Sequence, residues 1–131
     1  RVLIGEAFGQ RSPVATRSPT LYLDIALRAG AQLALPLAGE RALYAVDAPF
    51  TLDGQAQPAR QMVLLQAGEQ PVLAASAAAR VVLIGGEPLG RRFMAWNFVS
   101  SRRERIEQAK DDWRAQRFDP VPGETEFIPL P

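Results

Sequence analysis

The residue types that could do chemistry are unusually restricted in this chain, because its 131 residues include no histidine and no cysteine. Imidazole and thiolate ligands for a transition metal are therefore missing, and so are the Ser-His and Cys-His pairs of nucleophilic catalysis. Carboxylates remain, such as Asp111 and Asp112 near Glu104 and Glu107, but we expect them on a solvated helix face. We predict no catalytic residue and no metal ligand in this segment.

Charge sets a second limit on function. Lysine and arginine together number 15 and aspartate and glutamate 14, so the net charge is +1. A surface that binds nucleic acid needs a clear positive excess, and acidic residues further along the chain cancel the densest positive patch. We therefore expect no direct contact with nucleic acid. No apolar run approaches the ~18 residues of a membrane span, and we expect a cytoplasmic protein. The patch consists of Arg91, Arg92, Arg102, Arg103 and Arg105.

Short apolar runs alternate with turns over the first ninety residues. Residues 20–29 carry leucine or isoleucine at every second position, which indicates a strand with one buried face. Asp53-Gly54 is a strong hairpin signal. The apolar run 62–65 predicts a buried strand, and a further strand over 80–84 ends at Gly85-Gly86. Short strands at this spacing predict an antiparallel β-barrel or sandwich.

The last third of the chain has a different pattern. Ser101 and Glu104 have the spacing of a capping box, in which each side chain bonds to the other residue's backbone amide. Ile106 and Trp113 lie on one face at helical spacing. The fold class that we predict is mainly β, with one C-terminal α-helix and an extended tail. The predicted order is strands over 1–90, a helix over about 101–116 and the tail over 117–131.

Residues 93–99 form the most aromatic stretch of the chain. Such a stretch can belong to a core, line a small-molecule cavity, or dock on a partner. We expect the amide of Asn97 to bond to backbone groups, with ligand contact as the alternative. The candidate interaction surface or pocket consists of Met94, Trp96, Asn97, Phe98 and Trp113.

Several uncommon sequence words occur in one order. They include Gly85-Gly86-Glu87-Pro88-Leu89-Gly90, then Trp96-Asn97-Phe98-Val99-Ser100-Ser101, then Ile106-Glu107-Gln108-Ala109-Lys110-Asp111-Asp112-Trp113. With these words the chain resembles the C-terminal end of pirin-family proteins. Pirins resemble two cupin barrels in tandem, and this chain resembles only the second. The resemblance implies a single cupin-like domain over 1–131, an antiparallel barrel or double-stranded β-helix. It also implies an N-terminal half that is missing here.

The resemblance also bears on cofactors. In that family a metal, usually iron, is held by histidines and a glutamate of the first barrel, so we expect iron only in the N-terminal cupin domain. A metal-bearing cupin strand carries two histidines at a fixed distance from a glycine, with a glutamate shortly after. Counted from Gly30, the histidine positions fall on Pro36 and Ala38, and the glutamate position falls near Ala42 or Leu43. Side chains of these types cannot ligate a metal.

These observations favour a non-catalytic, metal-free cupin domain. It would have a structural and protein-interaction role, and its partner would be the metal-binding N-terminal cupin domain or a second copy. One alternative is a small-molecule binding barrel or part of a quercetin 2,3-dioxygenase-like enzyme. Another, also implied by the resemblance, is a transcriptional co-regulator module. A filled barrel interior would argue against the first alternative, and the side chains expected there are Leu21, Leu23, Leu33, Leu35 and Val46.

Overall fold

Two long strands form the centre of the larger sheet. In the computed structural model, which describes all 131 residues, β4 (Thr20–Leu27) pairs antiparallel with β11 (Ala79–Gly86) along its whole length. Every second residue of β4 from Leu21 to Leu27 is buried, because alternate side chains of a strand point to opposite faces. The strand predicted over 20–29 is therefore confirmed, although it ends at Leu27.

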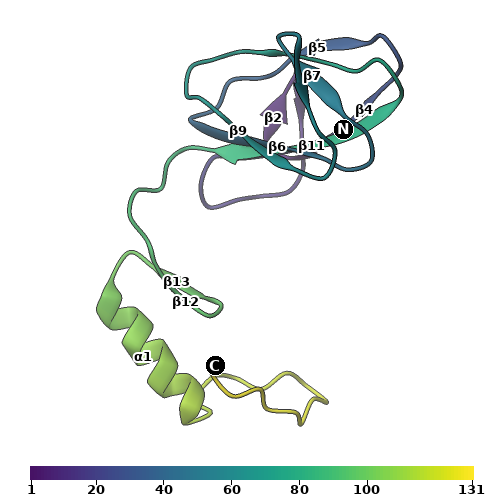
Figure 1. Ribbon diagram of the computed structural model, residues 1–131. Helices are drawn as coiled ribbons and strands as arrows, with labels where there is room; N and C mark the ends of the chain where they lie inside the picture. Colours follow the sequence, from purple (N-terminus) through teal and green to yellow (C-terminus); the bar gives the residue numbers. More distant parts are fainter. The chain divides into compact units, whose positions relative to one another are not determined.

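Two antiparallel sheets face each other across one core in the first unit of the chain, Arg1–Pro88 (Figure 1). The five-stranded sheet has the order β1 (Val2–Ile4), β4, β11, β6 (Glu40–Ala45) and β9 (Met62–Leu65). The four-stranded sheet has the order β5 (Gln32–Ala34), β10 (Val72–Ala74), β7 (Phe50–Leu52) and β8 (Gln55–Gln57). A small separate hairpin pairs β2 (Glu6–Ala7) with β3 (Gln10–Arg11). The mainly β, cupin-like architecture that we predicted is confirmed.

Large apolar side chains from both sheets fill the space between them. Leu23 and Leu83 from the larger sheet meet Phe50 and Leu73 from the smaller one, and all four are almost completely buried. Leu21, Leu23 and Leu35 are buried as expected, while Leu33 is half-buried. These side chains form the hydrophobic core between the two sheets.

One residue expected inside the barrel lies outside it. Val46 is 38% exposed, whereas Leu43 and Ala45 are buried in the core. The alternation along β6 thus places the odd-numbered residues inside, and Val46, which follows Ala45, faces outward. The expectation for Val46 was wrong because the apolar run 42–46 does not show which alternate set is buried.

Asp53 and Gly54 form the turn between β7 and β8, as predicted. Their φ angles of 46° and 81° are both positive, which suits the tight turns that join two antiparallel strands. The Asp53 carboxylate also accepts the backbone N–H of Val72 at 2.8 Å. The turn is therefore tied to the neighbouring strand as well as to its own hairpin.

The strand predicted over 62–65 forms, but the prediction that it is buried is wrong. β9 pairs only with β6 and lies at the edge of the larger sheet. Leu64 is 80% exposed and Met62 is also exposed, while the two alternate residues are half-buried. A continuous apolar run lacks the alternation that would separate an edge strand from a central one.

Residues Leu89–Pro131 form a second compact unit. Its hairpin consists of β12 (Phe93–Ala95) and β13 (Phe98–Ser100), so strands extend beyond the predicted limit at residue 90. The helix α1 (Arg103–Arg114) contacts both strands and buries Ile106, the residue that helical spacing had placed on the inner face. It has neither the length nor the apolar character that crossing a membrane requires. Residues 117–131 form no further helix or strand, as predicted for the tail.

The predicted capping box does not form. The helix begins at Arg103, with Arg102 in an extended conformation before it and no side chain capping the first turn. Ser100 still pairs with Phe93 in the hairpin, so the chain leaves the strand too late for Ser101 to occupy the cap position. Glu104 instead forms an ion pair with Arg102 at 3.4 Å.

Candidate functional site

The positions that would hold a cupin metal lie between β5 and β6 and at the start of β6. Pro36 and Ala38 are half-buried, and Ala42 and Leu43 are buried. None of these side chains has a metal-binding atom, and nowhere in the chain do three histidine, cysteine, aspartate or glutamate side chains gather as a metal site would require. The residues present therefore do not fit the iron that the family implies.

A buried arginine lies beside these positions. Arg41 in β6 is only 4% exposed, and its guanidinium donates to the carbonyls of Pro36 at 2.8 Å, Gln66 at 3.1 Å and Glu69. Its Nε atom is buried without a partner. No carboxylate pairs with this cation, so backbone carbonyl dipoles alone offset its charge.

Arg41 joins three parts of the chain. Its carbonyl partners lie in the segment that leads into β6 and in the loop that follows β9, so one side chain holds both segments against the strand. Our sequence reasoning did not identify this role, because an arginine at the start of an apolar strand gives no sign of the carbonyls it will meet. A fixed cation here also disfavours a metal cation nearby.

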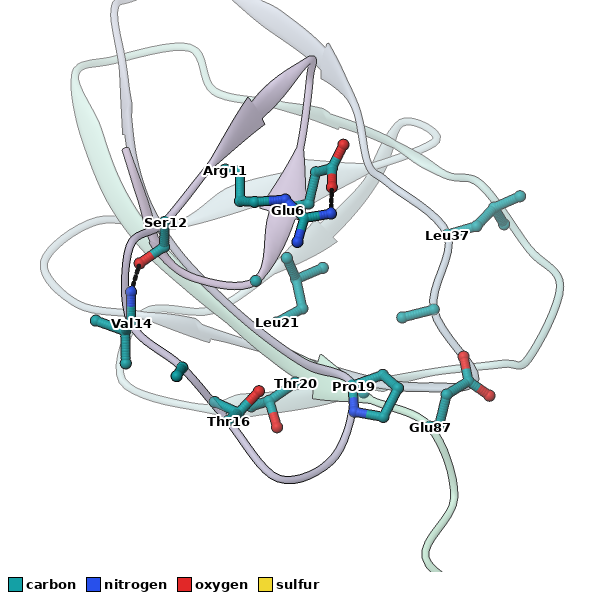
Figure 2. Close-up of a pocket in the computed structure, with 14 residues that line it drawn as sticks. Glu6, Arg11, Ser12, Val14, Thr16, Pro19, Thr20, Leu21, Leu37 and Glu87 are labelled. Carbon is teal, nitrogen blue, oxygen red and sulfur yellow. Dashed lines mark hydrogen bonds and ion pairs between the residues drawn. The ribbon is translucent and has the colours of Figure 1, made fainter.

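A cavity of about 560 Å³ lies beside the β2–β3 hairpin, entirely within the first unit. Leu21 lies in its wall, between Val14 on one side and Leu37 on the other (Figure 2). The volume is in the range of small-molecule sites. Ala38, one of the two histidine positions, lines the same cavity. No motif in the sequence indicates this cavity, because its lining comes from separate loops and strand ends.

The polar lining of this cavity comes from few side chains. Glu6 and Arg11 form an ion pair of 2.5 Å, joining the two strands of the hairpin directly opposite each other. Thr16 and Thr20 both donate their hydroxyls to the carbonyl of Ser18, at 2.8 and 3.0 Å. The remaining polar residues in the lining are Ser12 and Glu87.

The hairpin itself separates two cavities. A second cavity of about 480 Å³ contains Leu23 and Ile25 in its wall, and Arg11 lines both cavities. The hairpin begins at Gly5, whose φ of +85° and close approach to the Thr20 carbonyl leave no room for a side chain. Glycine at this position therefore allows the hairpin to lie close to β4.

In the second unit, three of the five candidate residues form one aromatic cluster. Trp96 and Trp113 have ring centroids 4.9 Å apart in an edge-on arrangement, and Phe98 lies 5.7 Å from Trp96 and 6.3 Å from Trp113. Phe118 and Phe127, which we had not singled out, extend the cluster into the tail. Spacing along α1 could not reveal them, because both lie beyond its end.

The other two candidates lie outside this cluster. Met94 is 75% exposed and pairs across the hairpin with Val99, which is also exposed. Asn97 is exposed in the turn, and its amide makes no hydrogen bond within the chain, so the expected bonds to backbone groups are absent. Trp96, the other turn residue, takes the positive φ of 53° instead.

Two arginines of the positive patch contact another aromatic ring of the same unit. Arg91 and Arg103 both lie over Phe93, each with its guanidinium carbon 5.1 Å from the ring centre. Cation–π contacts of this kind are worth about 0.5–1 kcal/mol at an exposed site. Arg102 pairs with Glu104. The patch is thus partly used in contacts within the unit.

The fold defines the class: this is a cupin domain. Residues 22–119 match the pirin C-terminal cupin domain, and the chain belongs to that family. The resemblance seen in the sequence is therefore confirmed.

Known relatives agree with this assignment. A pirin-like protein from Caulobacter vibrioides is 45% identical over 100% of this chain and 46% of its own length. A pirin-like protein from Solanum lycopersicum is 32% identical over 86% of this chain and 42% of its own length. A crystal structure of quercetin 2,3-dioxygenase from Acinetobacter baumannii has a TM-score of 0.85 at 28% identity, covering 99% of this chain and 46% of that one. The chain thus spans less than half the length of these relatives.

Proposed function

We propose that this chain is a metal-free, non-catalytic cupin domain of a pirin-like protein, and that its role is structural. The observation that carries the proposal is the Arg41 network, which occupies the neighbourhood of the metal-ligand positions with a cation bound to three backbone carbonyls. The residues at those positions, Pro36 and Ala38, contribute only shape. On this proposal iron belongs to the N-terminal cupin domain of the parent protein.

The proposed partner is that N-terminal domain, with a second copy of this chain as the other candidate. Apolar side chains exposed on the second unit support a docking role, because soluble proteins seldom leave such groups together without a partner. Met94 and Val99 form a cross-strand pair on the exposed side of the hairpin, next to Trp96 in the turn. We place the docking surface there, with Phe98 and Trp113 holding the hairpin in shape from the other side.

The alternative function is part of a quercetin 2,3-dioxygenase-like enzyme. It is favoured by the likeness to the Acinetobacter baumannii protein of that name and by the cavity beside the first hairpin. Under this alternative the domain would contribute residues to a site whose metal is held elsewhere. The core between the two sheets is filled by apolar side chains, so any residues that the domain contributes would come from the cavity beside the hairpin.

Iron loading of the purified chain tests the metal-free part of the proposal. The chain is incubated anaerobically with ferrous iron, desalted and measured by elemental analysis. We expect far less than one iron per chain, with no change in the midpoint of urea unfolding. One tightly retained iron per chain, with a raised midpoint, would show that the proposal is wrong.

Docking is tested by co-expressing this chain with the N-terminal half of the Caulobacter relative and measuring the mass of the purified species. We expect a one-to-one complex that Met94→Glu weakens by at least about tenfold, because the change buries a charge in the interface. Leu64→Glu, on the exposed edge strand β9 of the first unit, is the matched control and should have no effect. Equal effects of both changes, or no complex at all, would contradict the docking surface.

A further inference from the structure

We propose that the cavity beside the β2–β3 hairpin binds a small molecule with an apolar body and an ammonium group. This site goes beyond the structural role proposed above and does not depend on it, because all of its residues belong to the first unit. The argument rests on the walls of the cavity, on the hydrogen-bonding state of its polar side chains and on its charge.

The walls suit an apolar body. Val14 and Leu37 are both more than half exposed although they border a cavity, and Leu21 contributes a buried apolar surface between them (Figure 2). A ligand placed there would cover both exposed side chains, and burying apolar surface is the main source of affinity in such sites. The cavity volume of about 560 Å³ leaves room for a one-ring molecule with a short side chain.

The hydroxyl groups in the lining are available as acceptors only. Ser12 donates to the carbonyl of Leu3 at 2.6 Å and accepts the N–H of Val14 at 3.2 Å, so its hydroxyl is already used in both ways. The hydroxyl groups of Thr16 and Thr20 each have one hydrogen to donate, and both donate it to the Ser18 carbonyl. Their oxygens keep free lone pairs, so the group that they recognise must be a hydrogen-bond donor.

The charges in the lining select a cation among possible donors. Arg11 and Glu6 neutralise each other in their ion pair. Glu87 lines the same cavity, and its carboxylate makes no ion pair or side-chain hydrogen bond in the chain. The lining thus carries one uncompensated negative charge. A primary ammonium group supplies three hydrogen-bond donors and a positive charge. A neutral alcohol supplies one donor and no charge, and a carboxylate supplies no donor and is repelled by the negative charge of Glu87.

The test compares three probes of similar shape on the full chain: 2-phenylethylamine, 2-phenylethanol and 3-phenylpropionate. Binding is followed through the backbone amide resonances in two-dimensional NMR titrations. We expect saturable binding of the amine with a Kd on the order of a millimolar, weaker binding of the alcohol and none of the acid. The resonances that move should be those of the cavity, with Thr16, Thr20, Ala38 and Glu87 among them.

Two variants identify the contacts. Glu87→Gln should raise the Kd of the amine by about threefold, the size expected for an exposed charge pair, and leave the Kd of the alcohol unchanged. Leu37→Ala should weaken both probes alike. Glu69→Gln, an exposed carboxylate outside the cavity, is the control and should change nothing. Acid that binds as tightly as amine, shifts confined to other residues, no saturation by any probe, or an unchanged amine affinity in Glu87→Gln would each overturn the proposal.

Discussion

The indole N–H of Trp113 donates to the carbonyl of Ile128 at 2.8 Å and so joins the helix to the C-terminal tail. The same ring lies 5.7 Å from Phe127, nearly parallel to it. The end of the tail is thus held by this hydrogen bond and this ring contact, while its start is held by Phe118, which stacks on Phe98 with ring centroids 5.8 Å apart, and by Arg117, which pairs with Asp112 at 2.7 Å. Trp113 is therefore the residue that holds the segment around Phe127 and Ile128 against the helix.

Replacing Trp113 by phenylalanine should loosen the tail while keeping most of the ring contacts. The substitution removes the indole N–H that donates to the Ile128 carbonyl. Loss of this hydrogen bond should destabilise the docked tail by about 1 kcal/mol, which corresponds to roughly fivefold faster proteolytic cleavage within 117–131. Limited proteolysis followed by mass spectrometry measures the rate. Trp96→Phe is the matched control, because the Trp96 indole makes no hydrogen bond to the tail. Equal loosening by both variants would contradict the role given to the indole N–H.

Arg41 offers a test of the network that fills the metal-ligand neighbourhood. Changing it to methionine keeps an unbranched side chain but leaves three carbonyls without their donor. We expect the free energy of unfolding to fall by about 3 kcal/mol, as for other buried hydrogen-bond networks. Urea titration followed by circular dichroism measures the change. Arg28→Met is the control: Arg28 is exposed, and its loss should cost no more than about 0.5 kcal/mol.

Two glycines of the first hairpin allow the cost of an unfavourable backbone conformation to be measured apart from the cost of a steric clash. Both have positive φ, +85° at Gly5 and +70° at Gly9, but a Cβ would lie 2.1 Å from the Thr20 carbonyl oxygen at Gly5 and would meet nothing within 4 Å at Gly9. Gly9→Ala should cost about 1 kcal/mol, the usual penalty for this conformation. Gly5→Ala should cost several times more or prevent folding. Similar unfolding midpoints for the two variants would show that the hairpin does not lie close to β4.

The ion pair between Asp24 and Arg80 predicts a dependence of stability on pH. Arg80 bonds to both carboxylate oxygens, at 2.8 and 3.1 Å, and these hydrogen bonds hold the pKa of Asp24 below its usual value. The folded chain therefore binds the proton less readily than the unfolded chain. The pair stabilises the fold above the unfolded-state pKa of about 4, and this contribution is lost as the pH falls through the lower folded-state pKa.

Comparison with Asp24→Asn isolates that contribution. At pH 7 the variant should unfold at a lower urea concentration than the wild type. The difference should shrink as the pH falls below about 4 and disappear once Asp24 is protonated in the folded chain. Added salt should also reduce it, because Arg80 is largely exposed. A difference that stays constant down to the acid end of the titration would contradict this account.

The parts of the fold that the sequence predicted are those fixed by local rules. The alternation along β4 and the hairpin at Asp53-Gly54 depend on neighbours in the chain, and both predictions are confirmed. The errors concern position in the whole fold. β9 has the composition of a buried strand but lies at a sheet edge, and Ser101 has the type of a cap but follows a strand that ends one residue earlier.

The candidate sites show the same division. Trp96, Phe98 and Trp113 could be grouped in advance because hairpin and helix lie next to each other along the chain. The cavity could not be foreseen, since Glu6, Thr16, Leu37 and Glu87 come together only when the barrel closes. Whether the aromatic group docks on a partner stays a prediction.

The Arg41 network has a consequence for how such a domain can evolve. A lineage that gained metal binding here would need imidazoles at positions 36 and 38 and, at the same time, the loss of a permanent cation bonded to the carbonyl of residue 36. Either change alone is disfavoured. Imidazoles at positions 36 and 38 would hold a metal cation beside the positive charge of Arg41, and loss of Arg41 would leave three backbone carbonyls without a hydrogen-bond donor. A metal centre in this barrel would therefore require changes at positions 36, 38 and 41 together.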